Sequence, residues 1–236
     1  MQNAITNAIN YLSEINEPHG LIMLDVIYRR FEITEFADAL QRYDQEIVAR
    51  PEDASVLRVL RRIGDHDNKL QDGDLAAVTA EYDVLTVPAL YCDRIPLTFN
   101  YQSILYSAAT QGHYMLTHVL LSCIWIQENG CEVPLTEDTI NDIYFATERL
   151  LLDDSVVTDL ELEAAAFLYL AGQGSLVSDT FVEEVIAVQN YDGGWLRSSN
   201  EPGTSYWHAT ILGLMLLLHV QNPVDSYPPM LAPASP

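Results

Sequence analysis

Hydrophobic residues recur along this chain at the three- and four-residue spacing that is typical of amphipathic helices. In residues 3–16, one helical face carries only apolar side chains: Ile5, Ala8, Ile9, Leu12 and Ile15. We find no stretch with the strict alternation of apolar and polar residues that indicates a strand. The pattern therefore predicts an all-α protein of about ten helices.

Glycine, proline and capping residues set the expected ends of the other helices. The predicted helical ranges are 20–33, 34–49, 52–63, 75–87, two helices within 98–129, then 137–152, 159–171, 179–189 and 205–220. The expected N-caps are Thr34, Thr136, Thr158 or Asp159, and Ser178. The expected helix ends lie at Gly64, Pro88, Gly112 and Gly172.

The helices are of two kinds. Those at 20–28, 114–126, 162–171 and 206–218 are apolar all round, whereas 34–49, 137–152 and 178–189 have acidic faces. A helix that is apolar all round must be buried on every side. The alternation favours an inner and an outer ring of helical hairpins; an irregular bundle around four central helices is the alternative.

A weak internal repeat favours the ring. The segment from Tyr114 to Leu121 resembles the segment from Ser205 to Leu212, because each places an aromatic residue and a histidine before an apolar helix. We expect residues 1–74 to form an N-terminal helical lobe or part of the same ring, and residues 75–222 to form the hairpins. The polar stretch 64–74 is predicted to be an exposed loop, and the proline-rich tail 223–236 to extend over the surface.

Composition changes the functional picture more than the fold. The chain has 34 acidic and 11 basic residues and a net charge of −23, yet 49% of its 236 residues are hydrophobic. That hydrophobic content excludes intrinsic disorder. The shortage of Lys and Arg argues against nucleic acids, anionic membranes and polyanionic substrates as partners.

The three cysteines, Cys92, Cys123 and Cys131, form no CxxC pair. With no signal-peptide pattern at the N-terminus, this low, odd count predicts a reduced, cytoplasmic protein. Cys123 is expected to be buried and Cys131 to be the more exposed thiol. The longest apolar run, 211–218, is far shorter than the roughly 20 residues that cross a bilayer.

The most specific motif lies at residues 189–195, which read Gln-Asn-Tyr-Asp-Gly-Gly-Trp. We expect Gln189 to bond free carbonyls at a helix end, the glycine pair to allow positive φ, and Trp195 to fill a gap between helices. The motif resembles the Q-x-x-D-G-G-W element of terpenoid cyclases and protein prenyltransferase β-subunits. That resemblance covers residues 178–220 and implies an α/α-toroid, complete or partial.

The resemblance also suggests chemistry that this chain matches only in part. In the prenyltransferases the histidine that aligns with His208 is a zinc ligand, but the accompanying Asp-x-Cys is absent here. The second half of the chain has only Arg149 and Arg197 to bind a diphosphate. The Asp-x-Asp-Asp acid of the cyclases is also lacking, because 153–154 supplies only an Asp pair, which we interpret as a solvated turn.

A looser resemblance is to uncharacterised bacterial domains that occur beside natural-product and peptide-modification genes. Those domains carry a Tyr-x-x-Thr-His segment, an Asp-Leu-x-x-Glu segment, a Gln-x-x-Asp-Gly element and a downstream histidine. Here the matching positions are 114–118, 159–163, 189–193 and His208. The resemblance indicates candidate positions but implies no reaction.

His118, His208, Asp159 and Glu163 are the candidate catalytic residues. Asp159 and Glu163 share one helix face at i, i+4, and each histidine begins an apolar helix. Three interpretations remain open: a Zn²⁺ or Fe²⁺ site held by His118, His208 and Glu163, metal-free acid–base catalysis, or local hydrogen bonds that only close helix ends. The residues expected to line a pocket are Tyr114, Tyr206, Trp207, Asp192 and Trp195.

These features predict an enzyme of bacterial specialised metabolism that acts on an apolar small molecule or peptide in a central helical cavity. The alternative is a non-catalytic helical module that binds a peptide or protein partner. No nucleic-acid or membrane partner is expected, and the oligomeric state is left open.

Overall fold

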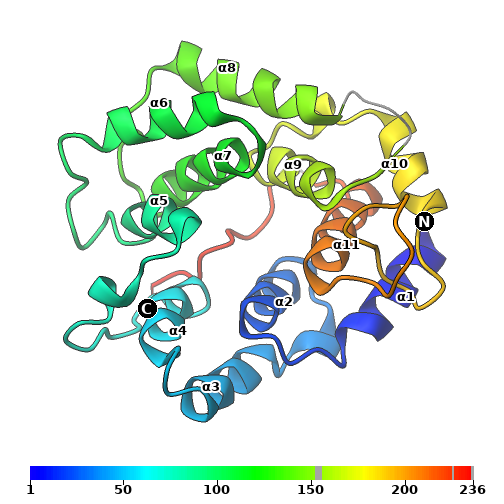
Figure 1. Cartoon of the computed structure of the whole chain (residues 1–236), viewed down its shortest axis with the longest axis horizontal. Coiled ribbons are helices and arrows are strands. Elements are labelled where there is room, and N and C mark those ends of the chain that lie inside the picture. Colours follow the sequence, from blue (N-terminus) through cyan, green and yellow to red (C-terminus); the bar gives the residue numbers. More distant parts are fainter. Residues whose placement is uncertain (152–155, 225, 235–236) are drawn as a thin grey trace. The chain divides into compact units, whose positions relative to one another are not determined.

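The computed structural model describes residues 1–151, 156–224 and 226–234 (Figure 1). These residues form eleven α-helices and five short 3-10 helices. They contain no strand, only an isolated antiparallel bridge between Thr158 and Ser198. The predicted all-α class and the count of about ten helices are therefore confirmed. The Asp pair at 153–154 lies outside the described residues.

The chain divides into two compact units, and neither is continuous in sequence. Unit 1 comprises residues 1–15, 108–120 and 135–225, and unit 2 comprises 16–107, 121–134 and 226–236. The division differs from the expected boundaries at 74 and 222, because N-terminal helix α1 (Gln2–Leu12) joins the C-terminal helices. Local composition does not show which distant helices a segment will pack against.

Unit 1 is built around two largely buried helices. These are α9 (Asp159–Leu170) and α11 (Trp207–Gln221), which pack against each other, while α1 packs on α11 and α8 (Glu137–Glu148) packs on α9 (Figure 1). Most residues of α9 and α11 are buried. The expectation that these two helices are internal is confirmed, whereas the ring arrangement stays a prediction.

Side-chain caps fix where the unit 1 helices begin. Thr158 caps α9 in a reciprocal capping box with Glu161, Thr136 caps α8, and Ser178 caps α10 (Asp179–Ala187). These three predicted caps are confirmed. Because capping satisfies amide groups that are otherwise unpaired, the box at Thr158 holds the first turn of α9, where Asp159 lies.

The Gln189–Trp195 motif follows the prediction at Gly193 and Trp195, but Gln189 bonds the first turn of α1 and a loop rather than carbonyls at a helix end. The Gln189 side-chain amide donates to the carbonyls of Ala4 and Gly193, both at 2.8 Å, and Gly193 has a φ of +95°. The Trp195 indole is buried and donates to the Val185 carbonyl at 2.7 Å. The motif therefore ties α1, α10 and the start of α11 together.

Unit 2 contains α2 (Pro18–Phe31), α3 (Ala39–Ala49), α4 (Ala54–Leu60) and α5 (Glu81–Leu90). The five 3-10 helices of the described chain are η1 (Thr34–Phe36), η2 (Arg61–Ile63), η3 (Leu75–Ala77), η4 (Arg149–Leu151) and η5 (Gly174–Leu176). Helices α6 (Tyr101–Gln111) and α7 (His113–Glu128) lie on either side of Gly112, as predicted, and each contributes residues to both units.

Two predicted helix ends in unit 2 are wrong. Thr34 does not cap a long helix, because it is the first residue of the three-residue η1, and α3 begins only at Ala39. Pro88 does not end a helix but lies inside α5. Since it lies in the last turn, its missing N–H removes a single hydrogen bond near a helix end, which this helix tolerates.

The loop at 64–74 is only partly exposed. Asp74 is buried and forms an ion pair with Arg58 at 2.6 Å, and the buried Asn68 amide donates to the Arg58 carbonyl at 2.7 Å. The prediction of an exposed loop is therefore confirmed for most of the segment and wrong at Asn68 and Asp74. A polar composition cannot distinguish a solvated loop from one that is anchored by a buried carboxylate paired with an arginine.

Most described residues of the C-terminal tail are exposed and outside any helix, as predicted, but Met230 and Leu231 are buried and anchor the tail within unit 2. Met230 is fully buried, and its backbone N–H donates to the Glu128 carboxylate at 2.9 Å. The Arg29 guanidinium donates to the Met230 carbonyl at 2.7 Å, and the Arg30 guanidinium donates to the carbonyl of Pro228. Charged side chains thus supply the partners that a proline-rich backbone cannot find in a helix or strand.

The expected reduced state of all three cysteines is wrong for two of them. Cys92 and Cys131 form a disulfide across 39 residues, with their Cα atoms 6.4 Å apart. The segments that meet here are also held by Asn129, whose amide donates to the carbonyls of Ala89 and Leu90. Cys123 is buried as predicted, and burial raises the pKa of its thiol to about 12.

Within the described residues, every helix is too short or too polar to cross a membrane.

Candidate functional site

The four predicted catalytic residues lie together in unit 1. Asp159 and Glu163 occupy successive turns of α9, His118 lies in the second turn of α7, and His208 lies in the first turn of α11. The His208 Nδ1 atom is 2.8 Å from Asp159 Oδ1 and 3.1 Å from Oδ2. Because a carboxylate only accepts hydrogen bonds, this contact places a proton on Nδ1 of His208.

Glu163 connects the two histidines. Its carboxylate is only 1% exposed; Oε1 lies 3.4 Å from His118 Nδ1, and Oε2 lies 3.5 Å from His208 Nε2. The Thr117 hydroxyl donates a hydrogen bond to Oε1. A hydroxyl and two imidazoles therefore surround the buried carboxylate and offset the cost of removing it from water.

Tyr114 extends this network at Asp159. Its hydroxyl donates to Asp159 Oδ2 at 2.8 Å, and its backbone carbonyl accepts a 2.7 Å hydrogen bond from His118 Nδ1. Burial, together with the negative charge of Asp159, raises the pKa of Tyr114 well above its ordinary value. Tyr114 is therefore a neutral donor that orients Asp159, rather than only a wall of a pocket.

His208 is the most accessible of the four groups, with 28% of its side chain exposed. Burial lowers the pKa of its imidazole, but the hydrogen bond to Asp159 and the charges of Asp159 and Glu163 outweigh burial. The net result is a raised pKa for His208. A partly exposed imidazole held between two carboxylates can accept and return protons.

Two aromatic rings lie next to His208. The centroids of Trp207 and Tyr206 lie 5.4 and 5.9 Å from that of His208. The Arg197 guanidinium lies over the Tyr206 ring, with Cζ 3.7 Å from the ring centroid. Two of the four aromatic residues predicted to line the pocket, Tyr206 and Trp207, thus adjoin the imidazole.

The other two predicted pocket residues have structural roles. The Asp192 carboxylate accepts hydrogen bonds from the backbone of Ser205 at 3.0 Å and of Gly194 at 3.3 Å. Burial raises the pKa of Asp192, but these hydrogen bonds and one from the Ser205 hydroxyl outweigh it and lower the pKa. Trp195 is 1% exposed and belongs to the core.

Two residues of the site are missing from the sequence-based candidates. Thr117 binds Glu163, and Arg197 supplies a positive charge that acts on His208 to lower its pKa. Thr117 is the threonine of the Tyr-x-x-Thr-His segment, so the motif contained the signal. Arg197 lies in a loop with no motif of its own.

The predicted metal site has no support from the side-chain arrangement. Among the described residues, no group of three or more His, Cys, Asp and Glu side chains is placed to hold a metal ion. Asp159 and the Tyr114 carbonyl take one nitrogen of each imidazole. Binding of Zn²⁺ or Fe²⁺ by His118, His208 and Glu163 therefore stays a prediction from the sequence.

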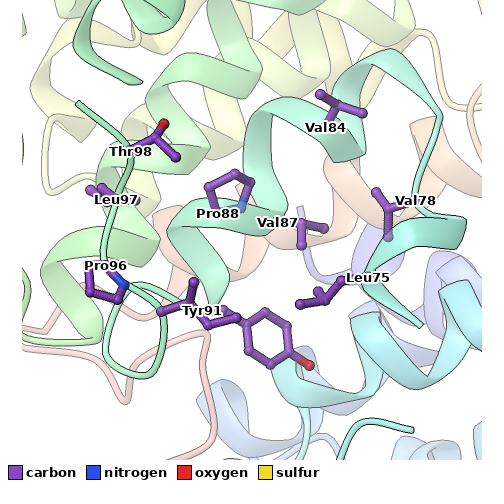
Figure 2. Close-up of a pocket in the computed structure, with 10 residues that line it drawn as sticks. Leu75, Val78, Val84, Val87, Pro88, Tyr91, Pro96, Leu97 and Thr98 are labelled. Atoms are coloured by element: carbon purple, nitrogen blue, oxygen red, sulfur yellow. The ribbon is translucent and has the colours of Figure 1, made fainter. Parts of the chain in front are cut away.

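Two hollows differ sharply in chemistry. In unit 1, a hollow of about 270 Å³ is lined by residues 196–197 and 201–206, which include Arg197 and Tyr206 beside the histidine network. In unit 2, a hollow of about 280 Å³ is lined almost wholly by apolar side chains, including Val87, Pro88 and Tyr91 (Figure 2). None of the predicted pocket residues lines the apolar hollow.

Comparison with known proteins adds no relative, since no family model, no curated protein and no solved structure matches this chain.

Proposed function

We propose that this chain is an enzyme that transfers protons to and from a small organic substrate, with His208 as the general acid and base. The observation that supports this most is the 2.8 Å contact between His208 Nδ1 and the buried Asp159, combined with the partial exposure of the imidazole. Asp159 fixes the orientation of the ring and stabilises its protonated form.

Proton transfer fits this geometry better than covalent catalysis does. A nucleophilic mechanism needs a hydroxyl or thiol within hydrogen-bond reach of the base. In the described part of the chain, the polar neighbours of the His208 ring nitrogens are the carboxylates of Asp159 and Glu163. These carboxylates stabilise a proton on the imidazole. Neither of them is a hydroxyl or thiol that the imidazole could activate as a nucleophile.

In the proposed reaction, neutral His208 takes a proton from the substrate and becomes an imidazolium. Asp159 and Glu163 stabilise the positive charge, and Tyr114 and Thr117 keep the two carboxylates in place. The same imidazolium then returns the proton to another atom of the substrate or to water. An isomerisation, elimination or cyclisation that is limited by proton transfer fits this scheme.

The aromatic rings of Tyr206 and Trp207 favour a substrate with an apolar part, such as a small molecule or a peptide side chain. A place in bacterial specialised metabolism is supported only by the family resemblance. A cytoplasmic location stays a prediction from the sequence, and the Cys92–Cys131 disulfide argues against it, because such bonds persist in oxidising compartments.

Profiling of metabolites in D₂O tests the proposal even though the substrate is unidentified. Wild type, His208→Gln and the control His113→Gln, which changes an exposed histidine outside the network, are each incubated with a bacterial metabolite extract. Mass spectrometry should show compounds that wild type and His113→Gln convert or label with deuterium and that His208→Gln leaves unchanged.

The melting temperatures of the three proteins serve as the control. If they are equal, a difference in conversion arises from the lost imidazole and not from unfolding. If His208→Gln converts the same compounds at the wild-type rate, the proposal is wrong. If wild type retains compounds but alters none of them, the chain is a binding module.

A further inference from the structure

Arg197 differs from most of the basic residues in this acidic chain. The guanidiniums of Arg29, Arg42, Arg50, Arg58, Arg61, Arg62 and Arg94 each lie within 4.0 Å of a carboxylate. The exposed guanidinium of Arg197 has no such ion pair with any described residue and instead stacks on Tyr206 at 3.7 Å. With 34 acidic residues available in the chain, a guanidinium without such a pair calls for a physical explanation.

The backbone holds Arg197 beside the histidine network. The Asp159 N–H donates to the Arg197 carbonyl at 2.8 Å, and the adjacent residues Thr158 and Ser198 form the isolated bridge. Tyr206, on which the guanidinium stacks, lies two residues before His208. Arg197 and Asp159 are therefore fixed to each other, and Arg197 and Tyr206 both line the 270 Å³ hollow.

Stacking leaves the donors of Arg197 available. A guanidinium carries five N–H groups in its own plane, and the Tyr206 ring covers only one face of that plane. The ring thus limits the rotation of the side chain while the N–H edges stay free to bind a ligand. A planar fork of this kind matches the two oxygens of a carboxylate.

The rest of the hollow limits the charge of the ligand. Glu201 lines the same hollow as Arg197, and the two side chains form no ion pair with each other within 4.0 Å. The hydroxyl-bearing residues Thr204 and Ser205 also line it. One cation beside one anion suits a singly charged group and disfavours a phosphate dianion or a diphosphate.

We infer that Arg197 binds a carboxylate group of the substrate, so that the enzyme acts on monocarboxylic acids whose reacting atom lies at His208. This inference rests on the proposed function, because it assigns substrate recognition to the same site. Bidentate binding by an Arg held on Tyr206 would position the substrate before proton transfer begins.

Nuclear magnetic resonance of the uniformly ¹⁵N-labelled protein tests the inference by binding alone. Wild type is titrated with three probes of similar shape, namely phenylacetate, the neutral phenylacetamide and the dianion phenyl phosphate, at constant ionic strength. The Arg197 Nε–H signal, assigned by its absence in Arg197→Gln, should move and saturate only with phenylacetate. The Trp207 indole signal should move with it.

Two variants complete the test. Arg197→Gln should weaken phenylacetate binding by about tenfold or more, as expected for the loss of a charge-assisted pair. Arg149→Gln removes an equal, exposed charge of unit 1 outside the hollow and should bind as wild type does. Equal responses to phenylacetate and phenylacetamide, an absence of saturation, or tighter binding of phenyl phosphate would overturn the inference.

Failure of carboxylate binding is distinct from failure of the proposed function. If carboxylate binding depends on Arg197 but His208→Gln has unchanged turnover, the inference about Arg197 holds. The proposed proton transfer at His208 is then wrong. If turnover depends on His208 but Arg197 binds no carboxylate, the proposed function holds. Monocarboxylic acids are then excluded as the substrate class.

Discussion

Replacement of Asp159 by Asn should make His208 a much weaker base. The substitution keeps the size of the side chain but removes the charge that lies 2.8 Å from His208 Nδ1. In wild type the hydrogen bond and charge of Asp159 and the charge of Glu163 raise the pKa of His208 against the opposing effect of burial. Without Asp159, burial and the Arg197 charge oppose only Glu163, so the pKa should fall.

The magnitude follows from the contact. A hydrogen bond to a charged group contributes about 1.5–3 kcal/mol. At a fixed pH, the ratio of protonated to neutral His208 should therefore fall by about ten- to a hundredfold. Because the proposed reaction forms the imidazolium from neutral His208, the weaker base should take the substrate proton more slowly, and turnover should fall.

Titration of the His208 ring carbons by NMR measures this directly, and the His208→Gln variant assigns the signal. Asp142→Asn is the matched control, since it removes an exposed charge from α8 in the same unit. An unchanged His208 titration in Asp159→Asn would refute the electrostatic argument. If the His208 pKa falls equally in Asp142→Asn, the fall results from the change in net charge and not from the contact with Asp159.

Three further outcomes are expected. Gly213→Ala should lower the free energy of unfolding in urea by about 1–3 kcal/mol through overpacking, because the new Cβ would lie 2.8 Å from the Trp195 ring. Reduction of the Cys92–Cys131 disulfide should lower the free energy of unfolding by about 2–4 kcal/mol, since a loop of 39 residues is released in the unfolded chain. The folded-state pKa of His208 is raised, so its protonation stabilises the fold below its unfolded pKa of about 6.5 and this contribution is lost as pH rises through the folded pKa. The difference in unfolding free energy between wild type and His208→Gln should therefore shrink as the pH rises from below 6.5 through the raised pKa of folded His208.

Each of these outcomes has an internal control. Gly203→Ala should leave stability nearly unchanged, because its new Cβ would meet only Leu196 at 3.9 Å. A reductant should not affect a double Cys92→Ser, Cys131→Ser variant, and quantification of free thiols should find only Cys123 in the oxidised chain. A pH dependence that persists unchanged in His208→Gln would assign it to another group.

Much of the local structure could be predicted because its causes are local. Thr136, Thr158 and Ser178 cap their own helices through hydrogen bonds to residues three positions on. Gly112 takes a positive φ of +71° that separates two helices, as its residue type allows. The i, i+4 spacing of Asp159 and Glu163 likewise predicts that both carboxylates share one face of α9.

The sequence-based predictions fail where a residue is held by contacts with a segment that is distant in the sequence. Met230 is buried by contacts with Glu128 and Arg29, and Cys92 meets Cys131 across 39 residues. In both cases the local sequence favours a surface tail or a free thiol. Long-range hydrogen bonds and a covalent bond outweigh that preference, and they cannot be read from residue spacing.

The sequence by itself determined the helical class, three of the four predicted caps, the roles of Gly193 and Trp195 in the Gln189–Trp195 motif, and the residue types of the candidate site. Only the tertiary structure decided that His118, Glu163, His208, Asp159 and Tyr114 form one connected network, and that Arg197 lies beside it. The physical reason is that helix periodicity fixes which residues share a face, whereas the packing of α7, α9 and α11 fixes which faces meet.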